Sequence, residues 1–361
     1  MVPTPGPDYK PLVQEVARLG GDLAQVWPQL DERLRPALGY DASTFCTIDP
    51  STLLWTSRQV IGIESSPARE RKALELEFRG DDLNSFPNLL MQQMPIGNLH
   101  TTSGGNLAKS IRYDALLREL DLSDEVRAVV RSEGLNWGIL TLYRRRPAEP
   151  FVYRDLRAIR DALEPFGALL RLRMLRFAAE NPGTIDRPPG LVQVSADGAV
   201  GDISPASAAR LETLDDPSAT TAAIAEVVAA FNAGDALAHV TLPAGEETSV
   251  TLHASPGADG KLAVVVEEDR LVLVDQRIAD HYKFTEDEVE ILPFYAQGRT
   301  TRTIAQILAI DAFTIQDWLI SMFKKTGTQN RADFLATIYA SHFDDRFVAG
   351  VQPSPYGFFV E

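Results

Sequence analysis

The sequence predicts a multidomain chain in which two α+β regions precede an all-helical C-terminal region. Its 361 residues are enough for two or three domains of about 100–200 residues each. Helical and strand periods alternate through residues 11–177 and again through 188–270, whereas only the helical period recurs from 284 to 341. We therefore expect three domains over these ranges, with a linker helix at 271–283 between the second and the third.

The first region combines helices with antiparallel strands. LVQEVARLGGDLAQVWPQLDERL has apolar residues at steps of three and four, which favours helix. STFCTID and TLLWTSRQVIGI are typical of two strands that meet at a turn around Asp49 and Pro50. NWGILTLYRRR is a further apolar strand, and a long helix over residues 153–179 closes the region.

The middle region is a smaller α+β unit. LVQVSADGAVGDI predicts a hairpin, because Asp197 and Gly198 at its centre tolerate the positive φ of a tight turn. Ser204 and Pro205 form a preferred start for a short helix. SVTLHAS and KLAVVVEED then supply two more strands, which completes an α+β arrangement.

Start and stop residues divide the last region into four helices. Thr285 and Glu288 form a capping box, and Gly298 is a natural stop for the first helix. Pro293 inside that helix is expected to bend it. A second helix is predicted between residues 300 and 308. The remaining caps and stops are Asp311 and Gly327 for the third helix, and Asn330 with Asp333 for the fourth.

Composition excludes several classes of protein. Cys46, the single cysteine, rules out an internal disulfide framework and lies in a strand pattern typical of a buried, inert thiol. The five histidines lack the close partners of a zinc site, and no serine–histidine–acid pattern stands in a recognisable context. We expect no catalytic residue, no metal and no cofactor.

Hydropathy and the N-terminus indicate a cytoplasmic protein without membrane attachment. No apolar run approaches the roughly 18 residues that span a bilayer, and MVPTPGPDYK lacks the features of a signal peptide. Residues 1–10 are expected to form a flexible tail. Residues 342–361 form a C-terminal extension to which the sequence assigns no role.

The order of core, cap and stop residues in the last region resembles the LuxR-type helix-turn-helix over about 55 residues. The matching positions are Thr285, Glu288, Ile291, Leu292, Gln297, Gly298, Ile304, Ala305, Leu308, Ile310, Thr314, Ile315, Lys325, Gly327, Asn330, Arg331, Ala332, Asp333 and Phe334. The resemblance implies that double-stranded DNA is a partner and that the third helix enters the major groove.

The resemblance also assigns roles to the surface of this region. The positions expected to face bases are Ala312, Phe313, Gln316, Asp317 and Ile320. Gln316 is suited to adenine, and either Phe313 or Ala312 to a thymine methyl group. The positions expected to hold phosphates are Thr300, Thr301, Arg302, Thr314, Lys324, Lys325 and Arg331. A homodimer is expected through the fourth helix, at Ala332, Leu335, Ala336 and Tyr339.

The charge distribution speaks against tight DNA binding by a monomer. Residues 1–176 hold 23 Lys and Arg against 23 Asp and Glu, whereas residues 177–361 hold 12 against 27. DNA-binding domains normally concentrate positive charge. Two interpretations therefore stay open: a DNA-binding regulator assisted by two-fold assembly, and a non-DNA-binding interaction protein with a degenerate, acidic helix-turn-helix.

The upstream regions resemble sensor domains. TFCTIDPSTLLWTSRQVIGI, DDLNSF and RYDALLRELDLSDEVRAVVRSEGLNWGILTLYRRR resemble the GAF-like sensor domain of actinobacterial-type LuxR regulators, and GLVQVSADGAVGDISPASAARL resembles a PAS-like domain. The resemblance implies a one-component transcription regulator with a small-molecule effector. Candidates for its pocket are Phe45, Trp55, Tyr113 and Trp137, each with core packing as the alternative.

Overall fold

A computed structural model of the chain describes residues 7–344, 346 and 349, apart from 51–52, 65, 80–81, 91, 182–187, 196–198, 246–247, 258–260, 269–275 and 297. The predicted turn at Asp197 and Gly198, the start of the linker helix and most of the C-terminal extension lie outside the described residues.

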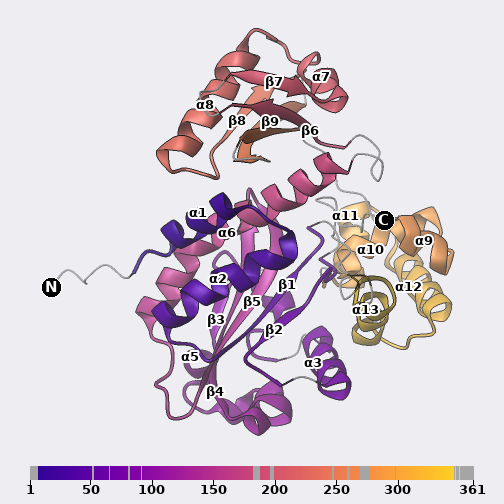
Figure 1. The fold of residues 1–361 in the computed structure, drawn as a ribbon. Helices are drawn as coiled ribbons and strands as arrows, with labels where there is room; N and C mark the ends of the chain where they lie inside the picture. Colours follow the sequence, from indigo (N-terminus) through magenta and orange to yellow (C-terminus); the bar gives the residue numbers. More distant parts are fainter. Residues whose placement is uncertain are drawn as a thin grey trace.

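The first domain is built on a five-stranded antiparallel sheet with the strand order β2-β1-β5-β4-β3 (Figure 1). Its strands are β1 (Ala42–Thr47), β2 (Gln59–Ile61), β3 (Ile96–Asn98), β4 (Leu122–Ser132) and β5 (Leu135–Arg145). Its helices are α1 (Lys10–Leu19), α2 (Leu23–Leu38), α3 (Pro67–Arg79), α4 (Phe86–Leu90), α5 (Leu99–Ser103), α6 (Tyr153–Glu180) and short turns at Leu107–Lys109, Tyr113–Leu117 and Arg118–Leu120. Apolar residues of α1, α2 and α6 pack on one face of the sheet.

Two features of the sequence explain how the first sheet packs. Side chains alternate between the two faces of a strand, so Phe45 joins the core under α6 while Cys46 joins the core on the opposite face. Gly138 on β5 faces β1 at close range, because a Cβ atom there would lie 2.8 Å from the Phe45 ring. Glycine at position 138 therefore leaves room for the Phe45 ring of the neighbouring strand β1.

The second domain repeats the plan on a smaller scale. Its antiparallel sheet has the order β7-β6-β10-β9-β8. The strands are β6 (Gly190–Val194), β7 (Val200–Ile203), β8 (His239–Pro243), β9 (Ser249–Pro256) and β10 (Leu262–Glu268), and the helices are α7 (Pro205–Leu211) and α8 (Ala219–Ala233). Ser204 caps α7 by accepting a hydrogen bond from the amide of Ser207, as its sequence predicts.

Helix α6 joins the two domains. Its Leu172 and Leu175 pack against Val265 of β10. Arg171 lies between the domains: its guanidinium is 2.6 Å from a carboxylate oxygen of Glu267 on β10 and 3.1 Å from one of Glu133, between β4 and β5. The C-terminal half of α6 therefore packs on the second sheet, while its N-terminal half packs on the first.

The C-terminal region from Gln276 to Asp344, called the tail below, is helical, as predicted. Its helices are α9 (Gln276–Tyr282), α10 (Glu286–Ala296), α11 (Thr301–Leu308), α12 (Ala312–Thr326), α13 (Arg331–Tyr339) and a last turn at Ala340–Asp344. The capping box is confirmed, since the Thr285 amide donates to Glu288 Oε2 at 2.7 Å and the Glu288 amide to Thr285 Oγ1 at 3.3 Å. Within the described residues, no single helix is long and apolar enough to cross a membrane; α11 and α12 pass that test only as a bent pair.

The tail lies beside the first domain (Figure 1), and apolar residues of both belong to one core. Helix α13 lies on α3, and the Tyr339 ring meets the edge of the Trp55 ring at a centroid distance of 6.0 Å. Trp55 in turn contacts Phe78 of α3 at 5.2 Å. The seat of α13, defined here as Trp55 and helix α3, therefore belongs to the first domain.

Candidate nucleic-acid interface

Helices α11 and α12 form the bent pair of a helix-turn-helix. Their axes are related by 117°, within the range of about 90–120° found in such motifs. Ala309 makes the turn in the left-handed region, with φ at 55°. Asp311 then caps α12, because its carboxylate accepts a hydrogen bond from the Phe313 amide at 2.8 Å. Ile315, Leu319 and Met322 anchor the inner face of α12 in the core.

The outward face of α12 is open to solvent. Phe313 is 77% exposed and Ile320 41% exposed, which is unusual for large apolar side chains. Gln316 and Asp317 are also exposed, and Ala312 is half-buried. The structure therefore brings the five predicted base-facing residues onto one accessible helix face.

The residues predicted to hold phosphates differ in how accessible they are and in whether they already make contacts within the tail. Thr300, Arg302 and Lys324 are exposed, while Thr301 and Thr314 are half-buried. Lys325 is already engaged, since its Nζ donates to Glu288 Oε2 at 2.6 Å and to the Lys283 carbonyl at 2.9 Å.

Arg331 is engaged in the same way as Lys325. It donates to the Ala296 carbonyl at 3.1 Å, and its guanidinium lies 5.7 Å from the centre of the Tyr295 ring. Both residues hold the tail together, a role that the sequence did not indicate. Arg302 and Lys324 are exposed like Lys325, but they are not among the residues that hold the tail together through the contacts described for Lys325 and Arg331.

The Glu288–Lys325 pair makes the stability of the tail dependent on pH. Burial raises the pKa of Glu288, but hydrogen bonds from Lys325, Ser321 and the Thr285 amide outweigh it, so the pKa lies below its usual value. A depressed carboxylate pKa contributes stability above the pKa of the unfolded chain, and that stability is lost as pH falls through the folded value.

We expect Glu288→Ala to lower the free energy of unfolding by about 1–2 kcal/mol at pH 7, because the helix loses its capping box and Lys325 loses its carboxylate partner. The difference from the parent protein should shrink as pH falls through the depressed folded pKa of Glu288, because the carboxyl is then protonated in both states. Urea unfolding of both proteins at pH 7 and at a pH below that pKa measures this difference. A difference that stays constant with pH would contradict the assignment.

The residues predicted to form a dimer lie on α13. Leu335 and Tyr339 are 3% and 2% exposed, and Ala332 and Ala336 are half-buried. The first domain of the same chain occupies this face. Self-association through Leu335 and Tyr339 therefore requires α13 to leave its seat.

The geometry of α10–α13 defines a four-helix helix-turn-helix domain with an uncovered third helix. Residues 283–338 match the family model described as "GerE: Bacterial regulatory proteins, luxR family". The C-terminal domain of this chain therefore belongs to the luxR family of bacterial regulatory proteins, as its motifs predict.

Solved structures of LuxR-type receptors are similar over much or part of the chain. Escherichia coli SdiA is 14% identical and covers 89% of this chain and 92% of its own, with a TM-score of 0.30. SdiA in complex with octanoyl-rac-glycerol is 15% identical, with coverages of 91% and 92% and a TM-score of 0.33. A Vibrio cholerae VqmA–ligand–DNA complex is 13% identical, with coverages of 42% and 82% and a TM-score of 0.21. No curated protein matches the chain.

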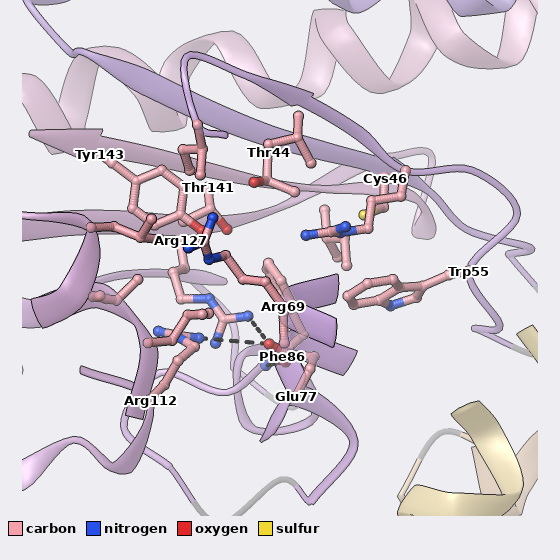
Figure 2. Close-up of a pocket in the computed structure, with 18 residues that line it drawn as sticks. Thr44, Cys46, Trp55, Arg69, Glu77, Phe86, Arg112, Arg127, Thr141 and Tyr143 are labelled. Atoms are coloured by element: carbon pink, nitrogen blue, oxygen red, sulfur yellow. Dashed lines mark hydrogen bonds and ion pairs between the residues drawn. The ribbon is translucent and has the colours of Figure 1, made fainter. Parts of the chain in front are cut away.

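A cavity of about 60 Å³ lies in the first domain, between the sheet face of Cys46 and helix α3 (Figure 2). Of the four aromatic residues proposed for a pocket, Trp55 lines it. Phe45 and Trp137 lie instead in the core with α1, α2 and α6. Tyr113 belongs to a third apolar cluster with Leu99 and Leu117. The core-packing alternative therefore describes these three positions in this structure.

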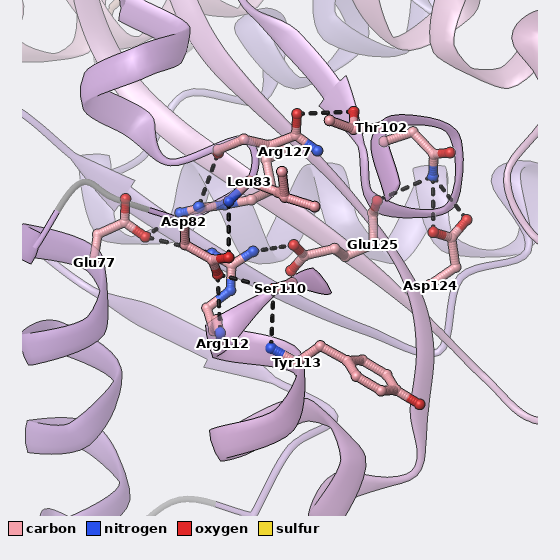
Figure 3. Close-up of polar contacts among 12 residues, drawn as sticks. Glu77, Asp82, Leu83, Thr102, Ser110, Arg112, Tyr113, Asp124, Glu125 and Arg127 are labelled. Atoms are coloured by element: carbon pink, nitrogen blue, oxygen red, sulfur yellow. Dashed lines mark hydrogen bonds and ion pairs between the residues drawn. The ribbon is translucent and has the colours of Figure 1, made fainter. Parts of the chain in front are cut away.

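Charged side chains that the sequence interpretation did not single out as pocket residues surround the cavity. Glu77 of α3 pairs with both Arg112 and Arg127, and Arg112 pairs with Glu125 of β4 (Figure 3). Arg127 also stacks 3.8 Å from the centre of the Phe86 ring. The sequence held one signal of this buried charged cluster. In DEVRAVV, Glu125 and Arg127 are two positions apart, so they lie on one face of a strand.

Cys46 is buried, and burial raises the pKa of its thiol to about 12. A thiol with so high a pKa has almost no thiolate at neutral pH and is unreactive. We expect a disulfide exchange reagent to label Cys46 only after unfolding in denaturant. Rapid labelling of the folded protein at pH 7.5 would contradict this expectation.

Proposed function

We propose that this chain is a one-component transcription regulator. Its α12 face binds double-stranded DNA, and the two upstream α+β domains control that binding. The observation that carries the proposal is the exposed outer face of α12, held at 117° to α11 by a buried core.

The charges on and around α12 favour weak binding of one domain to one DNA half-site, with tight binding only when two copies act together. Arg302 of α11 and Lys324 in the last turn of α12 are exposed cations, whereas Asp317 lies on the outer face of α12. Phosphate contacts supply much of the affinity for DNA, so a single domain with few cations binds weakly. Two copies on adjacent half-sites would bind far more tightly than either alone. Homodimerisation is therefore part of the proposal.

The test is capture of fragments from the source genome by the full-length chain, followed by gel shifts on an enriched fragment. Gln316→Ala should weaken the shift by about tenfold, as expected for the loss of one base contact of 1–3 kcal/mol. Gln329→Ala is the matched control, because Gln329 is exposed beyond the far end of α12. Equal effects of the two substitutions would contradict the assignment of α12 as the helix that faces DNA.

The alternative proposal, an interaction protein that does not bind DNA, rests on the same face. Phe313 and Ile320 of α12 are exposed and apolar, as is Ile307 of α11, and Asp311 and Asp317 at the cap and on the helix are exposed too. Exposed apolar residues beside acidic ones suit a partner protein with a basic rim. The absence of any shift at low salt, together with capture of a protein that Phe313→Ser abolishes, would favour this function.

A further inference from the structure

The cavity of the first domain has an excess of positive charge. Four arginines line it, namely Arg58, Arg69, Arg112 and Arg127, against the single carboxylate of Glu77. Glu77 is shared between Arg112 and Arg127, and Arg112 also pairs with Glu125, which is not part of the lining. Arg69 donates to the backbone carbonyl of Glu64, which carries no charge, and Arg58 meets the half-exposed Glu70 at 3.8 Å. Arg58 and Arg69 are therefore the arginines of the lining that are most available to an anion.

Two of these arginines keep unused donors inside the protein. Arg112 and Arg127 are 6% and 2% exposed, and the Nε atom of each is buried without a hydrogen-bond partner among the described residues. Burying a polar group without a partner is unfavourable. Such a deficit beside a cavity is relieved when a ligand supplies acceptor oxygens.

The rest of the lining is apolar and the space is small. Trp55, Phe86, Leu116 and Ile139 contribute to the walls. One water needs roughly 10–15 Å³, so a cavity of about 60 Å³ admits a ligand of about four to six non-hydrogen atoms. Apolar walls do not suit a free inorganic anion, whereas an organic acid presents both a charged end and an apolar body.

We propose that this cavity binds a small organic monocarboxylate, and that occupancy changes the docking of α13 on its seat. The second half rests on the proposed regulatory function. Helix α3 supplies Arg69, Ala73 and Glu77 to the cavity, and the same helix carries α13. Trp55 lines the cavity and also contacts Tyr339. A bound carboxylate that attracts Arg69 would shift α3, and its contact with Trp55 would shift that ring. Both α3 and Trp55 belong to the seat of α13.

The experiment uses the full-length chain and three probes: propionate, its uncharged analogue propionamide, and inorganic phosphate. Isothermal titration should show saturable binding of propionate, with propionamide and phosphate at least about tenfold weaker, because only propionate combines a carboxylate with an apolar body. Arg69→Gln and Arg58→Gln should each weaken propionate binding about tenfold. Arg71→Gln, on the exposed side of α3, should leave the affinity unchanged.

Hydrogen exchange in residues 331–339 reports the docking of α13. With propionate bound, we expect the amides of α13 to exchange at a different rate, and Trp55→Phe to reduce that change. Equal binding of propionamide, no effect of Arg69→Gln, or tighter phosphate binding would overturn the ligand assignment. Binding without any change in α13 would overturn the coupling. Neither readout uses DNA, so failure of the proposed DNA-binding function would leave this result standing on its own.

Discussion

Replacing Trp55 by alanine is expected to separate the helix-turn-helix domain from the first domain. Trp55 is 8% exposed and lies between Phe78 of α3 and Tyr339 of α13. Large-to-small substitutions of this kind lower the free energy of unfolding by about 3–5 kcal/mol, because a cavity remains where the ring was. Since the core on both sides of Trp55 is continuous, the loss should appear in the tail as well as in the first domain.

Urea unfolding and hydrogen exchange in residues 331–339 measure the two effects. Trp55→Phe is the milder variant; it keeps an aromatic ring against α3 and should lose only part of the contact with Tyr339. Tyr153→Ala is the control, because Tyr153 is 77% exposed and its loss should change stability by less than about 0.5 kcal/mol. Unchanged exchange of α13 in Trp55→Ala would show that this ring does not hold the tail.

Release of α13 should also uncover Leu335 and Tyr339, which the sequence places on a dimer face. Sedimentation of Trp55→Phe over a range of concentrations is therefore expected to show more self-association than the parent protein. A second substitution, Leu335→Asp, should abolish the increase, because a buried charge at an apolar contact is unfavourable. Self-association that survives Leu335→Asp would place the dimer contact elsewhere.

Replacing Asp317 by lysine is expected to raise the affinity for duplex DNA by at least about tenfold at low salt. Asp317 is exposed on the outer face of α12, where its charge repels phosphates. Each new phosphate contact steepens the plot of log K against log salt by about 0.9. The gain should therefore disappear at high salt.

Glu290→Lys is the matched control for Asp317→Lys. It makes the same change of charge on the exposed surface of α10 in the same domain. If α12 is the DNA-facing helix, Asp317→Lys should exceed Glu290→Lys in both affinity and salt dependence. Equal gains would indicate that net charge alone, and no particular helix face, governs the affinity.

The features that the sequence predicted are encoded within a few residues of one another. The caps at Asp311 and Asn330 and the stop at Gly327 act over three or four residues, so their pattern fixes the helix ends directly. The outward positions of α12 follow from the same helical period. The helix-turn-helix and its exposed face were therefore predictable.

The seat of α13 and the cavity could not be predicted from the sequence, because both depend on contacts between distant segments. Glu77 and Arg127 are 50 positions apart, and Trp55 lies far from Tyr339 in the chain. Strand β4 was also missed, because Asp124, Glu125 and Arg127 interrupt its apolar pattern, although all three are buried. Charge buried through long-range pairing resembles a solvated loop when the sequence is read locally.

The claim that α12 faces DNA is tested most directly by photo-crosslinking. A benzophenone side chain placed at Phe313 samples the outer face of α12, and the same group at Tyr153 samples an equally exposed site on α6, since both residues are 77% exposed. We predict that the group at position 313 crosslinks to bound duplex DNA and that the group at position 153 does not. Equal crosslinking from both positions, or crosslinking from 313 to protein alone, would contradict the account.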